Sequence, residues 1–383
     1  MEGSGRVRQY QDAYDLERFS KSEEEFESFY DQDLHHLAEE LEAERKDLIR
    51  SHRRPYFILM LLTVAATAYI YFFAELKNLL AIPGVWIAYY LFVGHRREMQ
   101  FKETEAELKE RIKEELLTKI IYFMNEHFTY KPTHYIRAKH FVDAHIFADE
   151  FDYYSGDDFV EGYVGEGEER TKVYFSEVTA DKLVTYEHRR RVTRWREAAF
   201  QGLFFMADFN KDFEGLTTIV PKEKRKSWIS RFFTKRDEGI LREMETMDIE
   251  FDKTFTVKTT DEIKARYILT PALKQRLMEF AKHQRSNKSN AKYRKKEATR
   301  QSLEQMDRHP VPKKYTKPLK RAKSYFSFLD GKMYFMLHTN QSHFESHIHQ
   351  KVNKKMFVEY YKDINRAMQL VDDMNLNLRI WNK

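Results

Sequence analysis

Two uncharged apolar runs lie close together near the beginning of the chain. The first run, residues 56–73, holds 18 residues without a charged side chain, and the second, residues 79–94, holds 16. A helix that crosses a membrane needs about 20 predominantly apolar residues, with a range of about 17–25. The five residues between the runs, 74–78, leave room only for a tight turn. The sequence therefore predicts a two-helix transmembrane hairpin over residues 55–95.

The charges beside the two runs predict the orientation of this hairpin. Arg53 and Arg54 precede the first run, and Arg96 and Arg97 follow the second. In the turn, Lys77 is the only Lys or Arg. Because loops rich in Lys and Arg stay on the cytoplasmic side of a membrane, we expect a two-pass protein of the inner (cytoplasmic) membrane with both termini in the cytoplasm. The alternatives are a buried helical hairpin in a soluble core and a hairpin that dips into one leaflet.

The residues on either side of the hairpin are predicted to be helical. Residues 1–54 form an acidic arm, since residues 1–49 hold 15 acidic and 6 basic side chains. Residues 96–126 are highly charged and form a helical stalk. In both segments apolar residues recur every three or four positions, which is typical of an amphipathic helix. These residues are Phe26, Tyr30, Leu34, Leu37 and Leu41 in the arm, and Leu108, Ile112, Leu116 and Ile120 in the stalk.

Residues 127–383 mix predicted strands with predicted helices. Asp330-Gly331 lies between two apolar runs, and this dipeptide supplies the positive φ angles of a type I′ hairpin turn. Thr259 with Glu262 predicts a capping box, and Thr270-Pro271 predicts the start of another helix. The fold class is therefore α+β, with the transmembrane hairpin followed by a cytoplasmic domain that has a mainly antiparallel sheet and flanking helices. The predicted strands are Phe159–Val164, Thr171–Phe175, Phe200–Phe209, Leu216–Val220, Phe251–Val257, Ser324–Leu329 and Lys332–Leu337, and the last predicted helix is Val352–Met374.

Several long blocks of this sequence resemble a known family. One block is Phe200-x-Gly202-Leu203-Phe204-Phe205-Met206-Ala207-Asp208-Phe209-Asn210-Lys211, continued by Phe213-x-Gly215-x-Thr217-x-x-Val220-Pro221. A second block runs from Asp261 to Leu273, and a third runs from Asn375 to Trp381. Together they are similar to an uncharacterised bacterial family of membrane-anchored proteins, domain of unknown function 3137 (DUF3137). The resemblance covers roughly residues 100–383 and implies no catalytic residue.

Two basic segments are the candidate contact sites. Residues 285–323 hold 14 Lys or Arg and only three acidic residues, and they form a cationic insertion. Residues 222–235 mix cations with Trp228, Phe232 and Phe233, a combination that suits a membrane interface. The insertion is interpreted either as a segment that contacts anionic lipid headgroups or as a solvated loop. Binding of nucleic acid through its phosphates is the third interpretation. The residues assigned to contact are Lys222, Lys224, Arg225, Lys226, Trp228, Arg231, Lys235, Lys292, Arg294, Lys295, Lys296, Lys313, Lys314, Lys320 and Arg321.

Candidate metal ligands are few. His343 and His347 are four residues apart, so on a helix they would share one face, as zinc ligands do. Asp208-x-Asn210-x-Asp212 begins like a calcium loop but lacks the Gly and Glu that such a loop needs. Cysteine is absent, which excludes thiolate sites and disulfides. No catalytic motif and no cofactor motif is found.

These observations favour a non-enzymatic, membrane-anchored protein whose cytoplasmic domain binds a protein partner, the anionic membrane surface, or both. Such a protein would act as a scaffold or assembly subunit, with a protein partner or a second copy of the chain bound to it. The alternative is a metal-dependent enzyme that uses His343 and His347.

Overall fold

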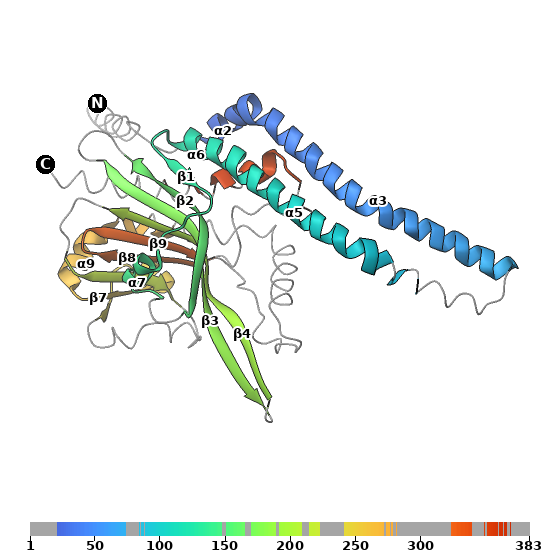
Figure 1. Ribbon diagram of the computed structural model, residues 1–383. Coiled ribbons are helices and arrows are strands. Elements are labelled where there is room, and N and C mark those ends of the chain that lie inside the picture. Colours follow the sequence, from blue (N-terminus) through green and yellow to red (C-terminus); the bar gives the residue numbers. More distant parts are fainter. Residues whose placement is uncertain are drawn as a thin grey trace. The chain divides into compact units, whose positions relative to one another are not determined.

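In the computed structural model, the protein consists of two compact units (Figure 1). The sheet unit comprises residues 1–22, 121–344 and 360–383, and the helix unit comprises residues 23–120 and 345–359. The structure describes residues 21–73, 84, 86–87, 89–147, 151–164, 170–188, 191–208, 214–222, 241–271, 273–275, 277–278, 281, 323–338, 348, 351–358, 360–362, 364–365 and 368.

The described strands of the sheet unit form one antiparallel sheet of nine strands, in the order β1-β2-β3-β4-β9-β8-β5-β7-β6. This arrangement confirms the predicted antiparallel sheet. Its strands are β1 (Thr129–Lys131), β2 (Tyr153–Val164), β3 (Thr171–His188), β4 (Arg191–Asp208), β5 (Leu216–Pro221), β6 (Arg242–Met244), β7 (Phe255–Thr259), β8 (Lys323–Leu329) and β9 (Lys332–His338).

The hairpin of β8 and β9 joins the two halves of this sheet. Strand β9 pairs with β4 and strand β8 pairs with β5, so β4 and β5 are not neighbours although they follow each other in the sequence. The turn has Asp330 at φ 45° and Gly331 at φ 74°. These two positive φ angles are those that the Asp-Gly dipeptide predicts for a type I′ turn.

A row of stacked phenylalanines crosses the middle of the sheet. Phe175, Phe205, Phe335 and Phe326 come from β3, β4, β9 and β8, and each is the register partner of the next. Their ring centroids lie 5.0, 5.4 and 5.0 Å apart along the row, with interplanar angles below 30°. All four side chains are buried. Because a shift of one residue would move a ring to the other face, this row fixes the pairing of four strands.

The opposite face of the sheet carries a second aromatic core. Helix α7 (Ala138–Asp143) places Phe141 against this face, where its ring centroid lies 5.4 Å from those of Phe200 and Phe204. Phe147 follows α7 and lies 4.9 Å from Tyr325. The two sheet faces are thus buried separately, and both consist largely of the aromatic side chains that are so abundant in the sequence.

Strands β3 and β4 extend beyond the sheet as a two-stranded ribbon (Figure 1). Strand β2 pairs with β3 only as far as Asp181, and β9 pairs with β4 only as far as Gly202. The β3–β4 pairing nevertheless continues to His188 and Arg191. The strand predicted over Thr171–Phe175 was therefore too short, because β3 continues to His188 through a stretch in which polar and charged residues such as Glu177, Asp181 and Lys182 interrupt the apolar ones.

Two antiparallel helices form most of the helix unit. Helix α2 (Glu23–Phe29), the π-helical turn η1 (Tyr30–Leu34) and helix α3 (His35–Phe73) follow one another without a break. The returning arm consists of the π-helical turn η3 (Tyr90–Gly94), helix α5 (His95–Arg111), the π-helical turn η4 (Ile112–Leu117) and helix α6 (Thr118–Met124). The predicted apolar stripes are buried, apart from Leu37, which is partly exposed. Among the described residues, helix therefore extends from Glu23 through the end of the predicted arm and over the predicted stalk as far as Met124.

The predicted transmembrane hairpin is wrong. Over the described residues, no helix combines the length and the apolar character that crossing a membrane requires. The first apolar run does not form a helix of its own, because it is the end of α3, whose earlier turns are rich in charged side chains. Of the second run, residues 79–83, 85 and 88 lie outside the described residues.

A segment from near the C-terminus is bound to the first half of α3. Glu42 accepts a hydrogen bond from the backbone N–H of Val352 at 2.9 Å, and Arg45 donates one to the carbonyl of Ile348 at 2.6 Å. Lys354 lies 3.2 Å from Asp31 and 3.4 Å from Glu27. The ring of Phe357 lies 5.9 Å from that of Tyr30. The described residues 348 and 351–357, which we call the strap, therefore contribute buried side chains to the core of the helix unit.

Two local expectations near residue 250 need correction. Residues 251–254, predicted as the first half of a strand, belong to helix α8 (Ile249–Thr254), because Asp248 caps this helix by accepting from the N–H of Phe251 at 3.1 Å. Helix α9 (Glu262–Ile268) is capped by Asp261 rather than by Thr259, whose hydroxyl lies 2.9 Å from that of Thr217. The cap predicted at Thr270 is present, since its hydroxyl accepts from the N–H of Leu273 at 3.2 Å.

Candidate functional site

The end of helix α3 exposes large apolar side chains. Six of them lie within eight residues, and each has 46–61% of its surface exposed. Folded proteins seldom leave so much contiguous apolar surface in water, so a patch of this kind marks a contact with another apolar surface. The six side chains, which we call the apolar patch, are Phe57, Ile58, Met60, Leu61, Leu62 and Val64.

An open groove of about 490 Å³ runs beside this patch. Thr63 and Trp86 hold its two walls together, because the indole Nε1 of Trp86 donates to the Thr63 hydroxyl at 3.1 Å. That bond satisfies the indole N–H, and the rest of the lining is almost entirely apolar. The groove is lined by Met60, Thr63, Val64, Thr67, Ala68 and Trp86.

Polar and aromatic residues mark the boundary of the apolar patch. His52 of α3 lies 3.5 Å from a carboxylate oxygen of Glu98 on α5, and its ring stacks near Phe101 with centroids 4.1 Å apart. One turn further, Tyr56 contacts Tyr89 edge to face at 5.8 Å. Amphipathic rings of this kind prefer the boundary between an apolar and a wet environment. The exposed arginines of this boundary are Arg53, Arg54, Arg96 and Arg97.

Most of the sequence-predicted site residues lie outside the described residues. This applies to the whole insertion up to residue 322, to residues 223–240, and to His343 and His347. Only Lys222 of the predicted contact residues is described. Its ammonium group donates to the carbonyl of Asp252 at 2.8 Å, and its backbone N–H donates to the carbonyl of Thr254 at 2.8 Å. Lys222 is therefore used to fasten the end of β5 to helix α8.

One group of carboxylates was not found from the sequence. Asp157, Asp158 and Glu177 have carboxylate oxygens within 4.8 Å of one another, and Asp158 and Glu177 are buried. A register irregularity between Asp157 and Val160 brings the two aspartates together, and Asp158 has φ 56°. The hydroxyl of Tyr130 donates to Asp158. The three positions are spread over two strands, so only the strand register could have indicated the group.

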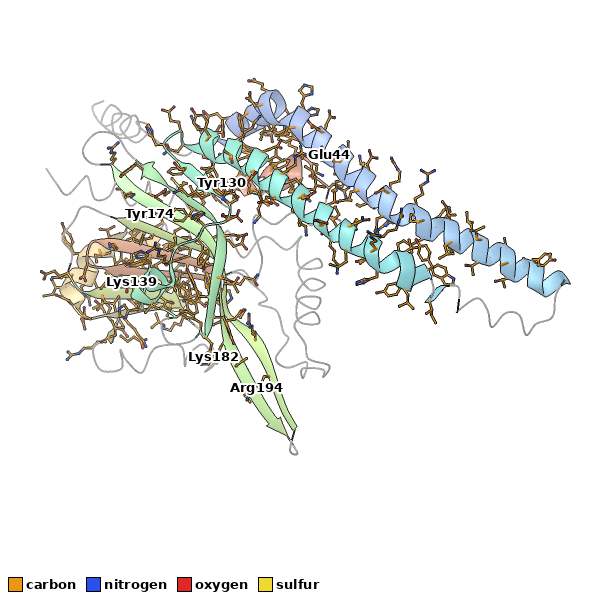
Figure 2. All side chains as sticks on the ribbon, in the orientation of Figure 1. Glu44, Tyr130, Lys139, Tyr174, Lys182 and Arg194 are labelled. Atoms are coloured by element: carbon orange, nitrogen blue, oxygen red, sulfur yellow. The ribbon has the colours of Figure 1, made fainter. Side chains whose placement is uncertain are left out.

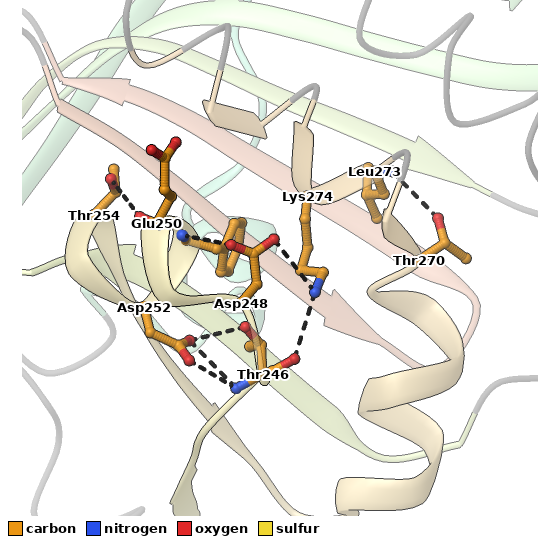
Figure 3. A network of polar contacts seen from close by, with 9 residues as sticks. Thr246, Asp248, Glu250, Asp252, Thr254, Thr270, Leu273 and Lys274 are labelled. Carbon is orange, nitrogen blue, oxygen red and sulfur yellow. Dashed lines mark hydrogen bonds and ion pairs between the residues drawn. The ribbon is translucent and has the colours of Figure 1, made fainter.

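A buried lysine is held in a polar network beside helix α8 (Figure 3). The Nζ of Lys274 lies 3.6 Å from Asp248 and 3.4 Å from the carbonyl of Thr246. Asp252 accepts from the N–H and the hydroxyl of Thr246. The N–H of Phe251, followed by the charge of Lys274, holds the pKa of Asp248 below its usual value. Lys274, Asp248 and Asp252 each have a polar partner, and these contacts join α8 to the residues before and after it.

A comparison with known families assigns the second half of the sheet. Residues 198–296 and 313–376 match a family described as protein of unknown function, DUF3137. These residues belong to the DUF3137 family. The match begins within β4 and contains β5 to β9, so the DUF3137 region includes the hairpin that joins the two halves of the sheet. No curated protein and no solved structure shows a significant match to the chain.

Proposed function

We propose that this DUF3137 protein is a non-enzymatic, membrane-associated binding protein. The apolar patch on α3 embeds in one leaflet of the cytoplasmic membrane, and the rest of the molecule binds partners at that surface. The single observation that supports this proposal is the exposure of six large apolar side chains within eight residues of one helix.

The apolar patch supplies a large favourable energy for membrane association. Full burial of one such side chain contributes about 1.5–3 kcal/mol, and these six are about half exposed. Their transfer into the acyl region therefore contributes on the order of 5–10 kcal/mol before the cost of immobilising the protein. A solvated patch would forgo this energy and would be liable to aggregate.

The boundary residues favour lipid over a protein surface as the partner of this patch. Arg53, Arg54, Arg96 and Arg97 lie next to the apolar surface, where anionic headgroups would lie beside acyl chains. Each cation near an anionic leaflet contributes about 1 kcal/mol. The tyrosines at the same level fit the headgroup region, where amphipathic rings gather.

The experiment is flotation of the full-length protein with lipid vesicles of neutral and of anionic composition. We expect the protein to float with both, and more strongly with anionic vesicles at low salt, since salt screens the arginines but not the apolar patch. The double variant Phe57→Gln, Leu61→Gln should lose most of this binding. A matched control is Ile263→Gln, Tyr267→Gln, which removes two exposed apolar side chains from helix α9.

Two outcomes would overturn the proposal. One is a wild-type protein that remains at the bottom of the gradient with both vesicle types. The other is a dimer in detergent-free buffer that protects the apolar patch from labelling and does not float, which would assign the patch to a second copy of the chain.

A further inference from the structure

The ribbon of β3 and β4 has open edges on both sides. Beyond Leu183, five residue pairs run from Val184 and Trp195 to His188 and Arg191. No other strand among the described residues pairs with either strand over this stretch. At about 3.3 Å per residue, the open stretch is roughly 16 Å long. Each open edge presents the backbone N–H and C=O groups to which a further strand could be added.

The base of the ribbon is firmly attached to the sheet. The N–H of Leu183 donates to the carboxylate of Asp152 at 2.7 Å, and the N–H of Asp152 donates to the carbonyl of Asp181 at 2.8 Å. The guanidinium of Arg196 lies over the ring of Tyr153 at 3.8 Å. Strand β4 carries one extra residue at Ala199, a bulge at the point where the ribbon leaves the sheet. The contacts therefore fix the base of the ribbon, where the open edges begin, and a fixed base lowers the entropic cost of binding there.

The charge of the ribbon identifies the kind of partner. Residues 182–197 contain six Lys or Arg and two Glu. Arg194 and Arg196 are exposed on the face that carries Leu183 and Thr185, while Lys182 is on the opposite face (Figure 2). A second copy of this ribbon would be repelled, because like charges opposite each other destabilise strand pairs. The occupant must be negatively charged.

We propose that an extended, acidic segment of a partner protein binds to this ribbon as an added strand. Backbone hydrogen bonds to the open edge supply affinity, and the cations select a segment in which acidic residues alternate with apolar ones. Leu183 is exposed and pairs with Arg196, so this part of the ribbon offers one apolar side chain and one cation to the alternating residues of the partner. A nucleic acid or a lipid headgroup would use the cations but neither the backbone edge nor Leu183. This inference concerns a surface other than the apolar patch and does not depend on membrane association.

The test uses two synthetic peptides with the same alternating glutamate and valine sequence. One has an ordinary backbone, and the other is N-methylated at alternate residues, so that it keeps the charge but cannot complete a strand ladder. Binding to the full-length protein in mild detergent is measured by fluorescence anisotropy, with hydrogen exchange of residues 183–188 as a second measurement. A short DNA duplex and phosphatidylglycerol vesicles serve as competitors.

We expect the ordinary peptide to bind and to slow hydrogen exchange in residues 183–188. The N-methylated peptide should bind at least about tenfold more weakly, since several backbone hydrogen bonds are lost. Arg194→Glu should weaken binding by about tenfold or more, and Arg194→Gln by less. Lys253→Glu makes the same charge change at an exposed position of α8 and should leave binding unchanged.

The proposal is overturned if neither peptide binds, or if both bind equally and hydrogen exchange is unchanged. It is also overturned if the duplex or the vesicles bind in preference to the ordinary peptide and this binding is lost in Arg194→Glu. In that case the ribbon is a general site for phosphate-rich polymers or surfaces.

Discussion

Arg45 holds Glu42 with two parallel hydrogen bonds, from Nε to Oε2 at 2.7 Å and from Nη2 to Oε1 at 2.9 Å. Both side chains are largely buried, with 9% and 12% of their surface exposed. The same two residues bind the backbone of the strap at Ile348 and Val352. A pair three residues apart on one helix thus holds a segment that follows it by more than 300 residues in the sequence.

We expect Glu42→Ala to destabilise the helix unit by about 3–5 kcal/mol, because it leaves the guanidinium of Arg45 buried without its partner. Asp47→Ala is the matched control. This variant breaks the ion pair between Asp47 and Arg50, which lies on the same helix, has the same spacing of three residues and has an N–O distance of 2.9 Å. Both of these side chains are about three-quarters exposed. The control should cost less than about 1 kcal/mol. Urea unfolding followed by circular dichroism measures both, and equal losses would contradict the structural role of Glu42.

The free energy of unfolding should depend on pH through the ion pair of Glu42 and Arg45. The hydrogen bond from Arg45 is the main cause that lowers the pKa of Glu42 from its ordinary 4.5 to about 2. A carboxylate with a lowered pKa stabilises the fold above its unfolded pKa, and this stabilisation is lost as the pH falls from 4.5 toward 2. We expect a loss of roughly 3 kcal/mol across this window. The difference in urea midpoint between wild type and Glu42→Gln should shrink over the same window, whereas a constant difference would assign the effect to other carboxyl groups.

Phe335 is the central ring between β4 and β8, in contact with Phe205 and Phe326. Its replacement by alanine removes two stacking contacts and leaves a cavity in a fully packed layer. We expect a loss of about 3–5 kcal/mol. Tyr267→Ala removes an aromatic ring that is 64% exposed, and it should change stability by at most about 0.5 kcal/mol. Thermal unfolding of the two variants provides the comparison.

Gly331 should accept asparagine better than alanine. Its φ of 74° is in the left-handed region. That conformation costs a residue with a Cβ atom about 1–2 kcal/mol of free energy, and it costs asparagine less than most. We therefore expect Gly331→Ala to lower stability by about 1 kcal/mol and Gly331→Asn to lower it by a smaller amount. If alanine proves the better tolerated of the two, the turn does not depend on its positive φ angles.

Local chemistry predicted much of the sheet. Asp330-Gly331 specified a hairpin turn, and the aromatic run Phe200–Phe209 specified a buried strand, because each signal is contained within a few residues. The apolar stripe from Leu108 to Ile120 predicted a buried helix face for the same reason. The cap of α9 was wrong because Asp261 and Thr259 are both good capping residues, and the sheet partner of Thr259 decided between them.

The remaining features depend on contacts that no short window contains. The ribbon of β3 and β4 requires knowledge of where β2 and β9 end, and the group of Asp157, Asp158 and Glu177 requires the register between two strands. The role of Glu42 depends on a segment from the other end of the chain. The uncharged run from residue 56 was interpreted as a separate membrane span, whereas in the structure it completes a long helix whose earlier turns are rich in charged side chains.

The place of the β8–β9 hairpin between β4 and β5 has a consequence for how this domain can change in evolution. Residues 223–240 lie between β5 and β6 in the sequence, and residues 282–322 lie between α9 and β8. The strands on either side of each segment are not neighbours in the sheet, so the length of the segment does not alter which strands pair. A loop that doubles in length costs only about 0.6 kcal/mol in closure entropy. We expect relatives to differ most in these two segments, while the residues that align the hairpin with β4 keep their spacing.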